Sequence, residues 1–220
     1  MIAEELISYS IPSLKTSDNA NKALTMMEEY KVTHLPIVNN EQFLGLISEN
    51  DILDINEPDE PLGNHSLSLT KPYVLRSQHI LDVLKLMSFL QLSLIPVLDD
   101  KNNYLGAITL KTLLIKFAEF TAIQNPGGII ILELNSNDYT LAQISQIVES
   151  NDAKILNMFV TAHPDSTKID VTLKVNRTDI TPILKTFTRY DYVIKASFGE
   201  DNFYDDLKER YDSFMNYLNI

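Results

Sequence analysis

The stretch LPIV at residues 35–38, followed by LGLISENDIL at residues 44–53, decides the fold of this chain. The same pattern returns as IPVL at residues 95–98 and LGAIT at residues 105–109. In each copy two short apolar runs are joined by a tight polar turn, which predicts a β-hairpin. Because the pattern occurs twice, we expect two copies of one structural unit.

The similarity extends on both sides of the hairpins. When residues 14–54 are aligned with residues 74–115, the second copy has one extra residue near Lys101, and with this single gap all matching positions align. Residues of the first copy that recur unchanged are Ser17, Leu24, Met27, Pro36, Leu44, Gly45, Ile47 and Leu53. A helix is predicted over residues 18–30 by its apolar spacing, with Ser17 or Asp18 as the N-cap, and a second helix begins near Ile52.

The predicted fold class is therefore α/β (α+β), with two β-α-β-β-α repeats over about residues 1–56 and 66–118. One unit alone would expose an apolar sheet face, so we expect the copies to pack about a pseudo-two-fold axis within a domain of residues 1–122. Residues 56–64 contain Pro, Gly and several acids, which is typical of a loop between the copies.

Composition excludes several classes of function. The formal net charge is −12, whereas binding to nucleic acid or to an anionic membrane needs clustered Lys and Arg. No apolar stretch approaches the roughly 20 residues of a membrane span, and the first ten residues lack the pattern of a secretory signal. The chain has no Cys, which excludes disulfides and thiolate chemistry. We expect a cytoplasmic protein.

The C-terminal part has a different pattern. Strands are predicted over residues 129–134, 153–162, 168–175 and 192–198, and helices over residues 140–150 and 180–188. The order β-α-β-β-α-β over residues 127–200 is that of the ferredoxin-like fold. Residues 202–220 predict a C-terminal helix with an apolar stripe formed by Leu207, Tyr211, Phe214 and Leu218. That stripe either meets a partner helix or packs on the protein's own sheet or dimer mate.

The repeated motifs at residues 35–53 and 95–109 resemble the signature of the CBS domain. CBS pairs form Bateman modules, which bind adenosyl ligands such as AMP, ADP, ATP or S-adenosylmethionine and regulate an attached or partner protein. With the ferredoxin-like part, the whole chain resembles CBS–ACT proteins of the acetoin-utilisation type. The resemblance implies an adenine-nucleotide-sensing regulatory protein and a homo-oligomer, most simply a dimer, that acts on an unidentified regulated protein.

The motif Gly45-x-x-Ser48-x-x-Asp51 lies where a strand passes into a helix. Ser48 would open the helix, whose free N–H groups favour a phosphate, and the Asp51 carboxylate can accept hydrogen bonds from both ribose hydroxyls. The same spacing is also an ordinary helix-capping pattern that needs no ligand. Local sequence alone leaves both interpretations open.

The resemblance implies the rest of the site, because one copy supplies the carboxylate and the other supplies the adenine pocket. Residues implied for this adenosyl site are Ser48, Asp51, Thr70, Leu92 and Ser93. A weaker mirror site would use Ser10, Val32, Thr33, Thr109 and Thr112, with Thr112 in place of the aspartate. His34 and Lys111 are candidates to meet a phosphate in the mirror site. No cofactor is required by these motifs.

Amino-acid-binding ACT domains usually carry a Gly at the first strand-to-helix turn, whereas this chain has NSNDY at residues 135–139. We therefore expect the ACT-like part to serve in dimerisation. The four His are scattered and no metal-ligand pair or phosphate loop appears, so we expect no enzyme and no metal site. Two alternatives remain. One is a ligand-free oligomerisation or protein-interaction module, and the other is an enzyme whose catalytic triad is brought together by the fold and leaves no motif in the sequence.

Overall fold

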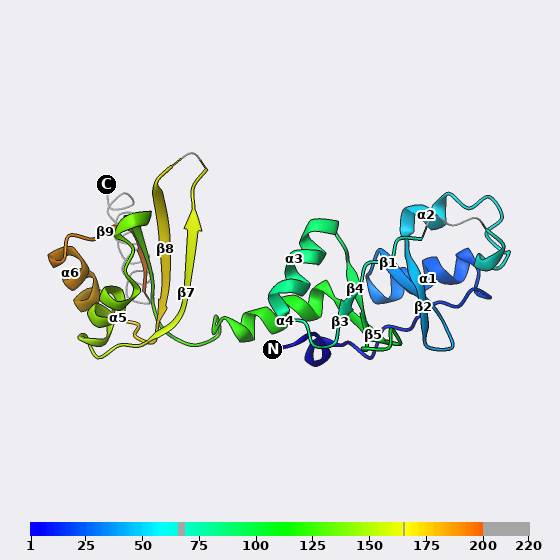
Figure 1. Cartoon of the computed structure of the whole chain (residues 1–220), viewed down its shortest axis with the longest axis horizontal. Coiled ribbons are helices and arrows are strands. Elements are labelled where there is room, and N and C mark those ends of the chain that lie inside the picture. Colours follow the sequence, from blue (N-terminus) through cyan, green and yellow to red (C-terminus); the bar gives the residue numbers. More distant parts are fainter. Residues whose placement is uncertain (66–68, 165, 200–220) are drawn as a thin grey trace, which may run out of the picture. The chain divides into compact units, whose positions relative to one another are not determined.

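The computed structural model describes residues 1–65, 69–164 and 166–199, and it divides the chain into two compact units, Met1–Phe120 and Thr121–Ile220 (Figure 1). Each unit has its own hydrophobic core. The first core is built from apolar residues of both sequence repeats, and the second from the sheet and helices of the C-terminal part.

The first copy consists of helix α1 (Ala20–Tyr30), strands β1 (His34–Asn39) and β2 (Gln42–Ser48), and helix α2 (Glu49–Leu53). A single parallel bridge joins Leu14 to Ile37 ahead of the helix. The second copy has strand β3 (Val74–Leu75), helix α3 (Ile80–Leu90), strands β4 (Leu94–Leu98) and β5 (Tyr104–Thr109), and helix α4 (Leu110–Phe120). Short 3-10 turns lie at Ala3–Leu6 and Leu62–Asn64. The predicted β-α-β-β-α repeat is confirmed.

The two hairpins share one hydrogen-bond register. Ile37 pairs with Gly45 in the first, and Val97 pairs with Gly106 in the second. The pairing shifts by one residue at the next step in both, between Ile37 and Val38 and between Val97 and Leu98. This equivalence matches the sequence alignment position by position, because the bulge and the glycine recur together.

One detail of helix α1 differs from the sequence-based expectation. Its N-cap is Asn19, whose side-chain oxygen accepts a hydrogen bond from the backbone N–H of Lys22 at 3.0 Å. Asp18, which we expected to share this role with Ser17, instead accepts from the N–H of Lys15. An Asn side chain caps a helix as well as Asp does, so the local pattern does not separate neighbouring polar residues.

Each copy is preceded by an extended segment, called its lead segment below. The lead segment of each copy forms a backbone hydrogen bond with the hairpin of the other copy. Leu46 in β2 donates its N–H to the carbonyl of Thr70, and Ser8 donates to the carbonyl of Ala107 in β5. A Cβ at Gly45 would lie 2.6 Å from the Cβ of Leu69, so the crossing needs glycine there. This reciprocal exchange brings residues of both copies together at each end of the pair.

The second unit is a four-stranded antiparallel sheet with the order β7-β8-β6-β9. Its elements are strand β6 (Ile129–Asn135), a 3-10 turn (Ser136–Asp138), helix α5 (Leu141–Glu149), strands β7 (Ile155–Ala162) and β8 (Lys168–Val175), helix α6 (Thr181–Arg189) and strand β9 (Val193–Phe198). Alternate residues of β8 are buried, and the two helices lie on one side of the sheet in Figure 1.

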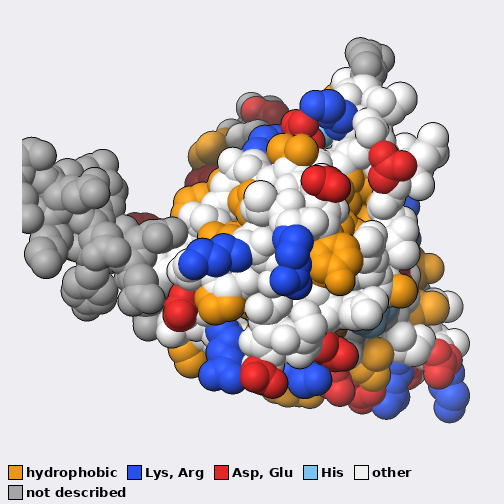
Figure 2. All heavy atoms as spheres, turned by 90° about the vertical axis from the view of Figure 1, so that its left-hand side faces the viewer, with side chains coloured by type: hydrophobic (Ala, Val, Ile, Leu, Met, Phe, Trp, Pro, Cys, Tyr) orange, Lys and Arg blue, Asp and Glu red, His pale blue; other side chains and the backbone are white. Residues whose placement is uncertain are grey.

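The order β-α-β-β-α-β with the first and third strands in the centre confirms the predicted ferredoxin-like fold. On the surface of this unit seen in Figure 2, acidic and basic side chains are interspersed, and hydrophobic side chains lie among them. The helix predicted over residues 202–220 lies outside the described residues.

Candidate functional site

The exchange of lead segments forms a cavity of about 400 Å³ beside Asp51. The first copy contributes Ser48 and Asp51 at the junction of β2 and α2, and the second contributes Thr70 and Leu92. These four of the five residues predicted for the adenosyl site therefore line one cavity. The remaining lining residues are His34, Leu46, Lys71, Pro72 and Leu90.

Ser48 and Asp51 form a capping box at the start of α2. The N–H and the hydroxyl of Ser48 donate to Oδ2 of Asp51 at 2.9 and 2.6 Å, and the N–H of Asp51 donates to Oγ of Ser48 at 3.2 Å. Every hydrogen bond that Asp51 accepts within the described part of the chain goes to Oδ2. The local capping interpretation is thus correct, and Oδ1 still offers an acceptor to a ligand.

Helix α2 changes one expectation. It contains only five residues, Glu49–Leu53, and its first N–H, that of Glu49, donates to the carbonyl of Thr33 at 2.9 Å. The predicted phosphate site at its N-terminus therefore loses its basis, because so short a helix has little dipole and the leading N–H already has an acceptor. Positive charge at this cavity comes instead from the side chain of Lys71.

His34 begins strand β1 and lines the Asp51 cavity, not the mirror site for which we considered it. Its Nδ1 lies 3.1 Å from Oγ of Ser93 and 3.1 Å from Oγ1 of Thr33, and it accepts from the N–H of Ser93 at 3.4 Å. Burial lowers the pKa of His34 below its ordinary value of 6.5, and the nearby charge of Asp51 partly opposes this effect.

Ser93 and Thr33 occupy equivalent places where the two copies meet. Oγ of Ser93 accepts the N–H of Thr33 at 3.0 Å. Ser93 lines the cavity on the mirror side and not the Asp51 cavity. Ser93 and Thr33 both line a third, largely apolar cavity of about 460 Å³. Both positions differ from the sequence-based assignment: the Ser93 hydroxyl contacts Thr33 and His34 of the first copy, and Thr33 lines the third cavity together with residues of the second copy.

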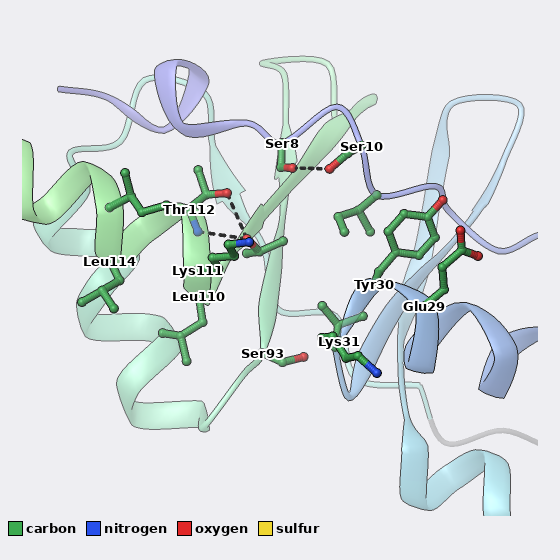
Figure 3. A pocket seen from close by; sticks show the side chains of 14 residues that line it. Ser8, Ser10, Glu29, Tyr30, Lys31, Ser93, Leu110, Lys111, Thr112 and Leu114 are labelled. Carbon is green, nitrogen blue, oxygen red and sulfur yellow. Dashed lines mark hydrogen bonds between the residues drawn. The ribbon is translucent and has the colours of Figure 1, made fainter.

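The mirror site is the larger space, with a volume of about 790 Å³ (Figure 3). Four of its five predicted residues line it, namely Ser10, Val32, Thr109 and Thr112. In Figure 3, Ser8 and Ser10 of the N-terminal segment lie above the cavity, with the end of α1 on one side and α4 on the other. Further lining residues that the motif comparison missed include Ser8, Glu29, Tyr30, Lys31, Leu114 and Ile115.

The two junctions share their backbone geometry but differ in charge. The N–H of Thr112 donates to Oγ1 of Thr109 at 3.1 Å, just as Asp51 donates to Ser48. The hydroxyl of Thr109 also donates to the hydroxyl of Thr112 at 3.0 Å. Thr112 therefore presents one partly engaged hydroxyl where Asp51 presents a carboxylate. Lys111 lines this cavity, as we considered, together with Lys31.

Within residues 1–65, 69–164 and 166–199, no group of three His, Asp or Glu side chains is placed to hold a metal ion. None of the helices described is long and apolar enough to cross a membrane.

Comparisons with known proteins agree with this architecture. The family model of the CBS domain matches residues 3–57 and 67–119. An inosine-5'-monophosphate dehydrogenase from Methanocaldococcus jannaschii is 22% identical over 151 residues, which are 67% of this chain but only 30% of that enzyme. The chain thus spans less than a third of this curated relative.

Two solved structures of CBS-domain proteins are similar to part of this chain. The crystal structure of a CBS domain pair/ACT domain protein from Thermotoga maritima is 23% identical, with a TM-score of 0.49, and the match covers 55% of this chain and 98% of that one. CBSX2 in complex with AMP is 20% identical, with a TM-score of 0.47, and the match covers 54% and 97% of the two chains.

The first unit is a pair of CBS domains, defined by the repeated hairpins, the exchanged lead segments and the family match. Residues 3–57 and 67–119 thus form a tandem pair of CBS domains, and a unit with the ferredoxin-like fold follows them in the chain.

Proposed function

We propose that this CBS pair is a regulatory module that binds one adenosyl ligand per chain, of the class AMP, ADP, ATP or S-adenosylmethionine, in the Asp51 cavity. The observation that carries the proposal is the meeting of Ser48 and Asp51 from one copy with Thr70 and Leu92 from the other around one cavity. Its volume of about 400 Å³ lies in the range of small-molecule sites. The module senses a ligand and does not catalyse a reaction.

Four of the lining residues have direct roles in this proposal. Oδ1 of Asp51 accepts the ribose hydroxyls, because Oδ2 is engaged in the capping box. Leu92 gives the adenine ring an apolar contact, and the Thr70 hydroxyl meets the edge of the base. Lys71 supplies a cation for a phosphate group.

Thermal shift with AMP, ADP, ATP and S-adenosylmethionine tests the proposal. A ligand at a hundred times its Kd adds about 2.7 kcal/mol to the free energy of unfolding, which raises the Tm of a domain of this size by roughly 5–10 °C. Asp51→Ala removes an acceptor whose hydrogen bonds contribute about 1.5–3 kcal/mol each, so the affinity falls at least about ten-fold. The ligand-induced shift is the quantity to compare, because this variant also loses a helix cap.

Thr112→Ala is the matched control and should leave the ligand-induced shift nearly intact. If Asp51→Ala keeps the full shift while Thr112→Ala loses it, the ligand occupies the larger cavity instead. If no adenosyl ligand shifts the wild-type protein, the proposal fails.

An interaction module that needs no ligand is the second candidate. It is favoured by large apolar side chains exposed on the helices of the CBS pair, such as Phe89 in α3, which is 82% exposed, and Leu114 in α4, which is 67% exposed.

We propose that the protein is a homodimer, with the ACT-like domain contributing to dimerisation. Sedimentation that finds only the monomer, at a concentration where interfaces of standard size are occupied, would contradict this.

A further inference from the structure

Besides Asp51, the wall of the Asp51 cavity contains another titratable residue, His34, whose counterpart in the second copy is apolar. Pro36 and Pro96 are equivalent, and two residues earlier the first copy has His34 where the second has Leu94. Leu94 is fully buried in the core at 0% exposure. His34 is half-buried and lines the Asp51 cavity. A titratable group thus faces this cavity at a position that its structural counterpart fills with an aliphatic side chain.

The hydrogen bonds of His34 determine which nitrogen carries its proton. Nδ1 accepts the N–H of Ser93, so the neutral ring carries its hydrogen on Nε2. That N–H is available to donate. When the ring is protonated, Nδ1 becomes a donor, and the hydroxyls of Ser93 and Thr33, both 3.1 Å away, can rotate to accept from it. Both protonation states therefore have partners.

We propose that His34 contacts the phosphate of the ligand and makes the Asp51 cavity bind phosphorylated adenosine more tightly as the pH falls. This inference rests on the proposed function and adds the ligand charge and a regulatory variable to it. The charged and titratable groups facing His34 in the cavity are Asp51 from α2 and Lys71 from the lead segment. The contributions of β4 and of the end of α3 are the uncharged Ser93, Leu90 and Leu92.

The direction of the pH effect follows from these charges. In the free protein burial lowers the pKa of His34, so the ring is neutral at pH 7. A phosphate in the cavity favours the charged ring and raises that pKa, so binding takes up a proton. Affinity therefore rises as the pH falls through the pKa of the bound form, and the gain is complete below the pKa of the free form.

Calorimetric titration of the full chain with AMP and with adenosine, at about pH 7.5 and about pH 5.5, tests this inference with wild type and His34→Leu. The variant copies the residue of the second repeat. A hydrogen bond to a charged group is about 1 kcal/mol stronger than a neutral one. Between the higher and the lower pH, the wild-type affinity for AMP should therefore increase by a factor that is roughly five times the factor found for the variant. Comparing the two proteins cancels the titration of AMP itself. Adenosine should show no difference in pH dependence between them.

Lys71→Gln is the control for general electrostatics. It should weaken AMP binding at both pH values, but the ratio of the AMP affinities at the two pH values should stay at the wild-type value. If His34→Leu keeps that ratio, the inference is wrong. NMR titration of the His34 ring gives a second measure that needs no variant, because AMP should raise its pKa; an unchanged pKa also overturns the inference.

The failure of the proposed function gives a different result. If wild type binds neither AMP nor adenosine at either pH, both proposals fall. If Asp51→Ala abolishes adenosine binding while His34→Leu leaves the pH ratio unchanged, the proposed function stands and only the role of His34 is overturned.

Discussion

Gly45 and Gly106 occupy the same register position in their hairpins, and each is approached by the segment leading into the other copy. A Cβ at Gly45 would meet the Cβ of Leu69 at 2.6 Å, and one at Gly106 would meet Cγ2 of Ile7 at 2.5 Å. Gly106 also has φ +153°, a conformation that other residues rarely adopt. These glycines therefore permit the exchange that builds both cavities.

Gly45→Ala and Gly106→Ala should each lower the free energy of unfolding by about 1–3 kcal/mol, because the added methyl group overpacks the crossing. We expect the larger loss for Gly106→Ala, which also strains the backbone. Urea unfolding measures both losses, and Gly63→Ala is the milder control because its Cβ would lie 3.2 Å from Thr16. An equal or greater loss for Gly63→Ala would contradict this account of the crossing.

At the scale of the element, helix α6 shows how the second, ferredoxin-like unit is held together. It begins at Thr181 with Pro182 in its first turn, where the missing N–H of proline costs nothing. Phe187 is fully buried, and its ring meets that of Tyr192 edge to face with the centroids 5.3 Å apart. Phe187 thus packs against the residue that directly precedes strand β9, and Ile183 of the same helix is buried in the same core.

Phe187→Ala should lower the free energy of unfolding of the second unit by about 3–5 kcal/mol, because it leaves a cavity in the core beneath the helix. Phe159→Ala in β7 is the matched control, since that side chain is 47% exposed and its removal opens no such cavity. Denaturant unfolding followed by circular dichroism measures both. Comparable losses in the two variants would show that α6 does not depend on this contact.

At the scale of the whole molecule, two cores account for the stability of the chain. Every buried residue of the first core lies between Ala3 and Leu113, and every buried residue of the second lies between Ile130 and Tyr192. The division predicted near Ala122 falls between these limits. Since each core is closed by residues of its own unit, the two units should unfold independently.

A fragment of residues 1–122 should therefore fold alone and give one cooperative thermal transition. In the full chain, Phe187→Ala should leave the transition of the CBS pair at its wild-type temperature. Calorimetry of the fragment, the full chain and this variant measures both effects. An aggregated or molten fragment would show that the CBS pair needs the C-terminal unit.

The sequence by itself determined the repeat, the two hairpins and the order of elements in both units. These features depend on local periodicity and on residues with restricted geometry, such as the glycines at residues 45 and 106. The resemblance also named Ser48, Asp51, Thr70 and Leu92, which the structure gathers around one cavity. Their spacing carries over because the fold holds these positions at the strand ends and lead segments.

Only the tertiary structure decided how the space around these residues is divided. It placed His34 beside Asp51, turned Ser93 toward the larger cavity and made the space beside Thr112 about 790 Å³ against about 400 Å³ beside Asp51. No local pattern contains this information, because cavity volume and side-chain direction depend on how segments about 60 residues apart pack against one another.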